Sequence, residues 1–423
     1  MLNTLNWPNA ASAAQTDSAQ QDHRLRKIVT YAYDYSDYYR ELMQGAGLTP
    51  ADIDGVSDLH RLPLSTKAAL AEQPLARLQS SDPTLGRKVS ESSSGSTGTP
   101  FTVAFDRRYL WDRNWRFLQG LLGAGYRWPD KLMLLTGDKN GRVSAWRRWR
   151  YVSLKLPAAE VTASYREFRP QVLYGCVTPL RELALQLLSG PAGYWRPRVL
   201  VTTAEALDGA TRQLLSEAFG CAVFDFYGMT EMGLVARECR AHSGYHLAPG
   251  SVVTELLPLN DGSGLSRLVY TNLALRATPL LRYVSGDLAQ GYTEQDCSCG
   301  NRHPRVARFE GRELDMVLLA DGSRRSPYQF TCVLEQFTEL RRYKVIQLSK
   351  ARILVQLEGC TTLTDQLLAD VRRTVDHIVA GQARIKVQQV ECLKTTPGVK
   401  FRVVESRLRD NASSSARQLT TNV

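Results

Sequence analysis

Helical and strand-like segments alternate along most of the chain, and this alternation limits the fold more than any other feature of the sequence. Four segments have the apolar spacing of amphipathic helices, over residues 23–46, 109–125, 179–188 and 209–219. Short runs rich in apolar and β-branched residues predict buried strands over residues 131–135, 199–203, 223–226 and 267–271. Helices that alternate with buried strands predict an α/β architecture.

The pattern changes at about Gly311. Strand-like stretches over residues 316–319, 343–348, 353–358 and 385–391 surround two expected helices, 327–338 and 363–380. This α+β pattern predicts a small, mobile C-terminal domain over residues 311–410, after a large N-terminal domain over residues 23–310. Gly311 could equally be a turn inside one domain. The polar ends predict a flexible arm over residues 1–22 and a disordered tail over residues 411–423.

The composition excludes several classes of protein. A chain of 423 residues that is 43% hydrophobic and 22% charged is expected to fold around a sizeable core. We find no apolar run of about 18 residues, the length that a membrane span needs. The N-terminus also lacks the basic start and apolar run of a signal peptide, so the cytoplasm is the expected location. Eight cysteines do not make a disulfide framework in so long a chain, and four isolated ones are expected to be reduced core residues: Cys176, Cys221, Cys332 and Cys360.

The formal charge of +11 is compatible with a nucleic-acid partner, an anionic substrate or simple solubility. The densest basic run, Arg142–Arg150, interleaves arginine with tryptophan, which would suit phosphate and stacking contacts. A solvated basic helix face with its tryptophans turned inward explains the same run. Charge alone therefore does not identify the partner.

A run of hydroxyl residues and glycines, residues 92–100, stands directly before an apolar, strand-like run, Phe101–Phe105. Glycine lets backbone N–H groups converge on phosphate oxygens, and serine and threonine add hydrogen-bond donors. A Walker loop would require Gly-Lys followed by Ser or Thr, and the chain contains no Gly-Lys pair. The run therefore predicts another kind of phosphate loop, with a flexible Ser/Gly linker as the alternative.

This loop resembles the signature of the adenylate-forming superfamily, which includes acyl-CoA synthetases, nonribosomal adenylation domains and luciferases. The segment Phe226–Gly233 is similar to the Tyr-Gly-x-Thr-Glu segment of that superfamily. The resemblance implies an α/β fold with a large nucleotide-binding domain and a mobile C-terminal cap. It implies that Thr230 contacts the α-phosphate and that Glu231 helps to hold Mg²⁺. The ATP-binding residues that it implies in these two segments are Ser93, Ser94, Gly95, Ser96, Thr97, Gly98, Thr99, Phe226, Tyr227 and Gly228.

Three further segments resemble superfamily motifs. Asp287, in Ser-Gly-Asp, is implied to bind the ribose hydroxyls. Arg312 is implied to lie near ribose and phosphate and Asp315 to be the hinge pivot, although two residues separate them where one is usual. Ala204 and Glu205 match a segment on the adenine side, although its glycine is missing.

Near the C-terminus, Thr396–Arg402 resembles the Gly-Lys-x-x-Arg end of the superfamily, displaced by one residue. The resemblance implies that Lys400 bridges the carboxylate and the α-phosphate, where it would neutralise charge in the transition state. Lys394 is the alternative lysine.

The short chain and the segment Pro170–Leu180 resemble the phenylacetate-CoA ligase and CapK-like branch, most of whose members activate aromatic carboxylates. Three thiols and one imidazole supply the ligand set of a closed structural Zn²⁺ site, and comparable sets occur in this branch. We predict as ligands Cys239, His242, Cys297 and Cys299, with His246 or His303 as substitutes for His242. Unligated cysteines in loops are the alternative.

The predicted reaction is ATP-dependent activation of a carboxylic acid to an acyl-adenylate with release of pyrophosphate, followed by transfer to CoA. Transfer to an amine, another nitrogen nucleophile or a carrier-protein thiol is the same-fold alternative, and a non-catalytic nucleotide- or nucleic-acid-binding protein is the alternative of another class. Expected partners are the acid, ATP, Mg²⁺ and CoA, without nucleic acid or membrane; the oligomeric state is open, a homodimer being one option. The acyl pocket is expected at residues 111–122 and 174–177 and around Met229 and Gly233.

Overall fold

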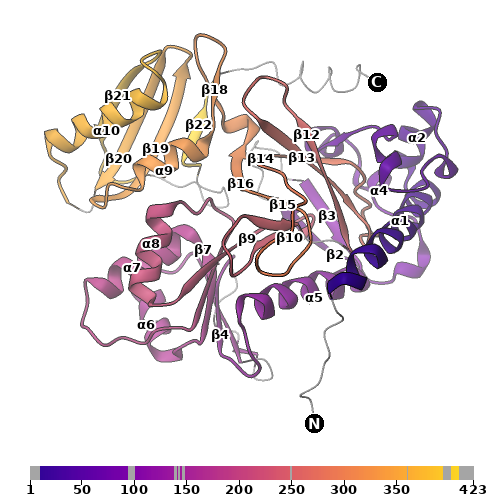
Figure 1. Ribbon diagram of the computed structural model, residues 1–423, viewed down its shortest axis with the longest axis horizontal. Helices are drawn as coiled ribbons and strands as arrows, with labels where there is room; N and C mark the ends of the chain where they lie inside the picture. Colours follow the sequence, from indigo (N-terminus) through magenta and orange to yellow (C-terminus); the bar gives the residue numbers. More distant parts are fainter. Residues whose placement is uncertain are drawn as a thin grey trace.

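The chain forms a large N-terminal part and a smaller C-terminal part (Figure 1). The computed structural model describes residues 10–93, 101–137, 141, 143–144, 148–247, 250–359, 361–393 and 402–408. Helices and strands mix in both parts, which confirms the predicted α/β class. Within these residues no helix has both the length and the apolar character that crossing a membrane requires.

A nine-stranded sheet, counted over the described residues, forms the centre of the large part. Its parallel strands are β4 (Leu132–Leu135), β6 (Trp149–Val152), β7 (Val172–Cys176), β8 (Val199–Thr203) and β9 (Ala222–Met229). Antiparallel strands complete it, namely β5 (Val143–Ser144) at one edge and β10 (Gly233–Glu238), β11 (Tyr245–Leu247) and β15 (Arg305–Val306) at the other. Parallel strands end at the same side of a sheet, so the segments after β7, β8 and β9 come together there.

Helices cover both faces of this sheet, as its continuously apolar parallel strands require. On one face, Met133 and Leu135 pack with α6 (Ala158–Phe168), α7 (Val177–Leu188) and α8 (Gly209–Phe219). On the other face, Leu132 and Leu134 pack with α5 (Arg107–Ala124). The predicted helix over residues 209–219 and the predicted strand over residues 199–203 have the observed boundaries.

A second sheet contains β12 (Val252–Pro258), β13 (Leu265–Asn272), β14 (Tyr283–Gln290), β16 (Arg308–Arg312) and the short β1 (Ser65–Thr66). β14 lies in the middle and pairs with β13, β16 and, in parallel, with β1. The hairpin of β2 (Val89–Ser93) and β3 (Phe101–Phe105) flanks the predicted phosphate loop. This sheet therefore brings the Ser-Gly-Asp and hinge motifs into adjacent strands.

The N-terminal segment differs from the predicted flexible arm over residues 10–22. These residues belong to α1 (Ala10–Tyr35), which is followed by α2 (Asp37–Gly45). The Asp22 carboxylate accepts a hydrogen bond from the Val56 backbone N–H at 2.9 Å, and Leu25 and Val29 are fully buried in a core with Leu281. Alanine and glutamine have high helix propensity, which explains how a polar, Ala-rich segment extends the helix.

The C-terminal part is a four-stranded sheet, in the order β21–β20–β19–β22, covered by two helices. The strands are β19 (Leu340–Ser349), β20 (Arg352–Gly359), β21 (Arg384–Gln389) and β22 (Val404–Ser406), and the helices are α9 (Pro327–Leu334) and α10 (Asp365–Ile378). Their shared apolar core begins at Val317, whereas β16 still pairs with β14 of the large part. The change of structure after β16 lies close to Gly311, where the sequence pattern changes.

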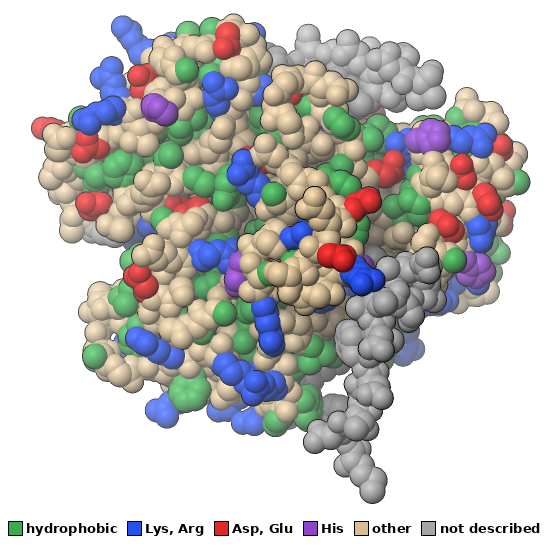
Figure 2. All heavy atoms as spheres, viewed as in Figure 1, with side chains coloured by type: hydrophobic (Ala, Val, Ile, Leu, Met, Phe, Trp, Pro, Cys, Tyr) green, Lys and Arg blue, Asp and Glu red, His purple; other side chains and the backbone are tan. Residues whose placement is uncertain are grey.

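The described residues of the basic run 142–150 form strands β5 and β6 rather than a helix face. Trp149 is buried, and Arg150 is paired with Glu167 at 2.8 Å and lies over the Phe168 ring. Figure 2 shows many lysine and arginine side chains on the lower part of this face of the molecule. In the described part of the run, then, one tryptophan and one arginine are already used within the fold.

Candidate active site

The hairpin between β9 and β10 presents Thr230 and Glu231. Gly228 pairs with Leu234 and Gly233 with Met229 there, and a Cβ on Gly228 would come within 2.6 Å of the Gly233 carbonyl oxygen. The close approach of the two backbones requires glycine at this position. Glu231 is buried, and its side chain accepts a hydrogen bond from the Tyr283 hydroxyl at 3.4 Å. A carboxylate held in this way is an oxygen ligand of the kind that Mg²⁺ prefers beside phosphates.

Three segments far apart in sequence meet around Asp287. β14 and β16 pair with Asp287 opposite Arg312, and the Arg312 Nε lies 3.7 Å from the Asp287 Oδ1. The Tyr227 hydroxyl donates a hydrogen bond to Asp287 Oδ2 at 2.6 Å. The Tyr227 ring stacks on the Phe309 ring, with centroids 3.7 Å apart and planes inclined by 12°. The structure thus brings together the predicted aromatic, ribose and hinge residues.

Electrostatics fixes the direction of the Tyr227–Asp287 hydrogen bond. Burial raises the pKa of the Tyr227 hydroxyl well above its usual value, and the negative charge of Asp287 raises it further. Tyr227 is therefore protonated at neutral pH and donates, while Asp287 accepts. The carboxylate of Asp287 is held by a phenol on one oxygen and faces a guanidinium on the other.

Two predicted ATP-binding residues have other roles in the structure. Phe226 is 1% exposed and packs in the core below α5, so its ring is not available to a nucleotide. Residues on a strand alternate between faces, which turns Phe226 toward α5 and Tyr227 toward the opposite face, against Asp287 and Phe309. Glu205 accepts a hydrogen bond from the Thr178 backbone N–H at 2.6 Å, at the start of α7. Ala204 precedes it with a left-handed backbone, φ 68°.

Other predicted residues fall outside the described part of the chain. These are Ser94–Thr99 of the phosphate loop, of which only the ends of β2 and β3 are described, and Lys394 and Lys400. The start of β3 lies beside β14, since the Phe101 and Tyr283 rings stack with centroids 6.4 Å apart. Asp315 follows β16 in a short 3-10 helix, Glu313–Asp315, and pairs with Arg402.

Lys67 is a residue of this cluster that the sequence interpretation missed. It begins the short helix α3 (Lys67–Ala71), directly after β1, whose Thr66 pairs with Val284 of β14. Burial lowers the pKa of Lys67, the negative charge of Glu231 opposes this, and the charge of Arg312 adds to it, so both groups lie near its ammonium. A lone lysine in the sequence Ser-Thr-Lys gives no signal that distinguishes it from a surface lysine.

The Cys/His group forms with one change from the prediction. The ligand atoms of Cys239, His246, Cys297 and Cys299 all lie within 4.8 Å of one another. Cys239 Sγ and Cys297 Sγ are 3.7 Å apart, and Cys299 Sγ is 3.5 Å from His246 Nε2. His246 Nδ1 faces the His303 carbonyl oxygen at 3.2 Å and so carries the proton, which leaves Nε2 as the lone-pair nitrogen.

His242, the predicted ligand, does not join this group. It lies in the turn between β10 and β11, where its Nδ1 is 3.5 Å from Glu238 Oε2 and its ring is 5.2 Å from that of Phe224. β10 and β11 pair with Arg237 opposite His246, which brings His246 beside Cys239. The antiparallel register, rather than sequence distance, thus selects the histidine.

The residues predicted to line the acyl pocket differ in their exposure. Phe117 and Tyr174 meet edge to face, with ring centroids 5.0 Å apart. Trp111 and Trp115, on the same helix, are 68% and 55% exposed. Aromatic residues are therefore present at the carboxyl end of β7, but the two tryptophans do not line a closed cavity there.

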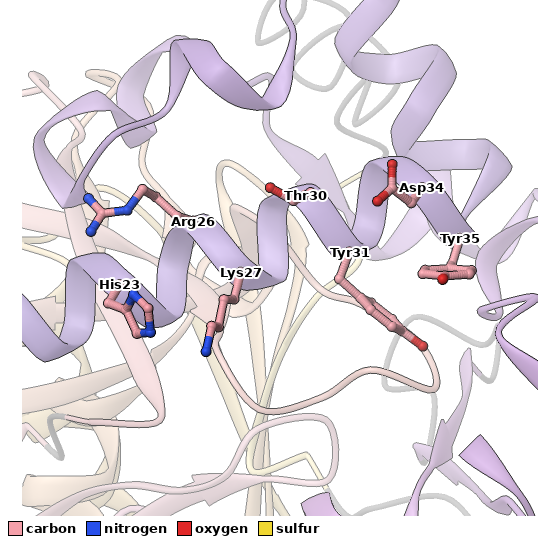
Figure 3. Close-up of a pocket in the computed structure, with 7 residues that line it drawn as sticks. All are labelled: His23, Arg26, Lys27, Thr30, Tyr31, Asp34 and Tyr35. Carbon is pink, nitrogen blue, oxygen red and sulfur yellow. The ribbon is translucent and has the colours of Figure 1, made fainter. Parts of the chain in front are cut away.

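Two open pockets lie elsewhere on the molecule. One, of about 430 Å³, runs along α1 (Figure 3) and is lined by His23, Arg26, Lys27, Thr30, Tyr31, Asp34 and Tyr35. The other, of about 600 Å³, is lined by Arg166, Arg169 and residues 191–196. Neither is lined by a residue of the Asp287 cluster, so the convergence of motifs, not cavity size, locates the candidate site.

Comparison with known proteins agrees with this geometry. No protein-family model matches the chain. The phenylacetate-coenzyme A ligase of Thermus thermophilus is 26% identical over 393 residues, which cover 87% of this chain and 86% of the relative. That of Escherichia coli is 26% identical over 426 residues, 93% of this chain and 95% of the relative. The chain is therefore similar to phenylacetate-coenzyme A ligases over most of its length.

Solved structures confirm the fold. The 2-hydroxyisobutyryl-CoA ligase in its postadenylation state, in complex with an acyl-AMP, is 18% identical and superposes with a TM-score of 0.77 over 98% of this chain and 93% of that chain. The same enzyme in complex with 2-HIB-AMP and CoA in the thioesterification state is 20% identical to this chain. It superposes with a TM-score of 0.62, over 97% of this chain and 94% of that chain. The adenylate-forming fold is confirmed.

Proposed function

We propose that this chain is an AMP-forming ligase that activates a carboxylic acid with ATP and transfers the acyl group to coenzyme A. The carboxylate oxygen attacks the α-phosphorus of ATP, the bond to pyrophosphate breaks, and an acyl-adenylate forms. The thiol sulfur of CoA then loses its proton, attacks the acyl carbon and displaces AMP. Similarity to phenylacetate-coenzyme A ligases supports an aromatic acid as substrate.

The observation that carries this proposal is the convergence of Glu231, Asp287 and Arg312 with the Tyr227 ring. An acceptor for ribose hydroxyls, a cation and a buried carboxylate lie within one site, and each has the chemistry that one part of ATP needs. Glu231 would hold Mg²⁺, which when bound neutralises phosphate charge. We assign Lys67 to the phosphates as well, because it brings positive charge beside Glu231.

In the proposed reaction, the protein acts mainly by positioning the substrates and by stabilising charge in the transition state. Asp287 would orient the ribose, while Arg312 would contact ribose or phosphate from the adjacent strand. Lys400 would neutralise the carboxylate and α-phosphate as the new bond forms. Thr230, at the tip of the β9–β10 hairpin, would donate to the α-phosphate.

The test is acid-dependent exchange of labelled pyrophosphate into ATP, over a panel of aryl and alkyl acids. We expect exchange with at least one acid, and mass spectrometry should show a CoA thioester only when CoA is present. An amide or a carrier-bound product instead would redirect the second step, and no exchange with any acid would overturn the proposal. Lys400→Ala should lose exchange but still use a supplied acyl-adenylate.

We also propose that Cys239, His246, Cys297 and Cys299 hold a structural Zn²⁺. Three thiols and an imidazole complete a tetrahedral set, which leaves no open position for catalysis. The ion would tie the β10–β11 hairpin to the loop after β14, and β14 carries Asp287. The hydrogen-bonding of His246 Nδ1 to a carbonyl, with Nε2 toward the thiols, is the orientation that a ligand histidine needs.

His242 provides a matched control for this zinc site, since it lies four residues from His246 and outside the group. Protein purified without chelator should contain about one zinc per chain by elemental analysis. His246→Ala should lower the zinc content and the melting temperature, whereas His242→Ala should keep the zinc. Zinc-free wild-type protein, or equal zinc loss in the two variants, would reject the site.

A further inference from the structure

A buried arginine of the large part makes its polar contacts with the C-terminal part. Arg181 lies in the second turn of α7, and its side chain is 9% exposed. Its Nε is 3.2 Å from Glu335 Oε2, and its Nη2 and Nη1 donate to the backbone carbonyls of Leu340 at 3.1 Å and Arg341 at 3.3 Å. Figure 1 shows the C-terminal part above α7 and α8. All three partners of this guanidinium belong to the C-terminal part.

Glu335, the acidic partner of Arg181, contacts both α7 and α8 of the large part. It follows α9 directly as its C-cap, is 17% exposed, and accepts a hydrogen bond from the Thr211 hydroxyl of α8 at 3.5 Å. Burial raises the pKa of Glu335, and Arg181 acts against this rise. When one member of a desolvated ion pair is removed or carried away, the other is left as an uncompensated buried charge. The two parts therefore cannot separate here without solvating both groups.

Arg181 is also close in sequence to residues of the candidate site. α7 begins at Val177, directly after β7, and its first turn is capped by Glu205 at the carboxyl end of the sheet. Arg181 is one turn further along, so the helix that carries it starts at the edge where the acyl pocket is predicted. The partner side, α9 and β19, belongs to the part that is expected to carry Lys400.

In the present arrangement of the two parts, the Arg181–Glu335 ion pair is formed. The chain superposes on 2-hydroxyisobutyryl-CoA ligase better in the postadenylation state than in the thioesterification state, with TM-scores of 0.77 and 0.62. A rotation of the C-terminal part about residues 313–315 would move Glu335, Leu340 and Arg341 together and leave Arg181 behind. The contact can therefore favour one of the two arrangements.

We propose that the Arg181–Glu335 pair holds the C-terminal part in its present arrangement, which resembles a postadenylation state more than a thioesterification state and which we assign to the first half-reaction. Arg181 is then a positioning residue. This inference rests on the proposed function. Loss of the pair shifts the population toward other arrangements. The first half-reaction then slows, because the competent arrangement is less populated, while transfer from a finished adenylate does not need the closed pair.

Arg282 is a closely matched control for Arg181. Its side chain is 8% exposed and pairs with Glu255, 17% exposed, at 2.9 Å, and it also donates to backbone carbonyls, those of His60 and Leu62. The difference is that all of these partners belong to the large part. Arg282→Met therefore removes the same kind of buried ion pair without touching the contact between the two parts.

The experiment compares Arg181→Met, Arg181→Lys and Arg282→Met in two assays, pyrophosphate exchange and thioester formation from supplied acyl-adenylate and CoA. Arg181→Met should slow exchange at least about 10-fold relative to thioester formation, because each tenfold change in arrangement population changes the competent fraction by the same factor. Arg181→Lys should restore part of the loss. Arg282→Met should leave the ratio of the two rates as in the wild type, and an unchanged ratio in Arg181→Met would overturn the inference.

Small-angle scattering of the unliganded protein separates this inference from the proposed function. Arg181→Met should move the scattering curve away from the curve calculated for the present arrangement, whereas Arg282→Met should keep it. If no acid supports exchange in the wild type, the proposed function fails, and the scattering comparison still decides whether the pair fixes the arrangement. Identical curves for wild type and Arg181→Met would refute the holding role.

Discussion

Replacing Tyr227 by phenylalanine should weaken ATP binding and leave the aromatic stack in place. The change removes the hydroxyl that donates to Asp287 at 2.6 Å but keeps the ring that stacks on Phe309 at 3.7 Å. A hydrogen bond to a charged group is worth about 1.5–3 kcal/mol. If Asp287 holds its productive orientation through this bond, loss of the bond should raise the KM for ATP by about 10-fold to about 150-fold.

Tyr245 supplies the matched control for Tyr227. Its hydroxyl donates to the buried Asp225 at 2.7 Å, and its ring also contacts Phe309, edge to face at 4.9 Å. Tyr245→Phe therefore removes the same type of hydrogen bond from the same aromatic cluster, but not from Asp287. Steady-state pyrophosphate exchange with varied ATP gives the KM of each variant, and urea unfolding gives its stability.

The expected outcome is a loss of stability in both variants and a raised KM for ATP in Tyr227→Phe alone. An equal rise of KM in both would mean that the cluster acts through general packing. An unchanged KM in Tyr227→Phe would refute the positioning of Asp287 by this phenol, whatever the stability. Because Phe309 keeps its stacking partner in both variants, the comparison isolates the hydrogen bond.

Two further predictions concern charge. Lys67→Met should raise the KM for ATP at least about 10-fold, with little effect on thioester formation from supplied acyl-adenylate. Lys67→Arg should recover most of the lost ATP affinity. Equal effects on both half-reactions would indicate a structural role for Lys67 instead. Burial raises the pKa of Asp225 from 3.8 to about 6, so stability from this group is full below about pH 4 and is lost as pH rises through 6. Asp225→Asn should therefore remove about 3 kcal/mol of pH dependence between pH 4 and 7.5 in urea unfolding, and an unaltered pH profile would count against this assignment.

Local patterns allowed much of the fold to be predicted from the sequence. The helix over residues 209–219 and the strand over residues 199–203 are bounded by residues that end elements on their own, such as Asp208, whose side chain caps α8, and Gly220. The predicted change of architecture near residue 311 coincides with the end of β16. The helix that contains Leu25 and Val29 was predicted from residue 23 on, whereas its extension over residues 10–22 was missed because this segment is polar and has no apolar stripe.

The pairing of strands that are far apart in the chain could not be predicted from the sequence. The motifs named Asp287 and Arg312, but only the β14–β16 register places them opposite each other. The same limitation explains the histidine: Cys239 and His242 have the spacing of a metal corner, yet the β10–β11 register brings His246 to the thiols. Lys67 depends on a parallel pairing of two residues with β14, which no local pattern encodes.

β14 connects these observations, because it carries Asp287 and pairs with both β1 and β16. Its first residue, Tyr283, pairs with Ser65 two positions before Lys67 and donates to Glu231, while Asp287 faces Arg312. The loop after β14 carries Cys297 and Cys299. A disturbance of the Cys/His group would therefore reach Asp287 along a strand, so zinc loss should raise the KM for ATP before it unfolds the protein. Zinc loss that lowers stability at an unchanged KM would show that the ion supports the hairpin alone.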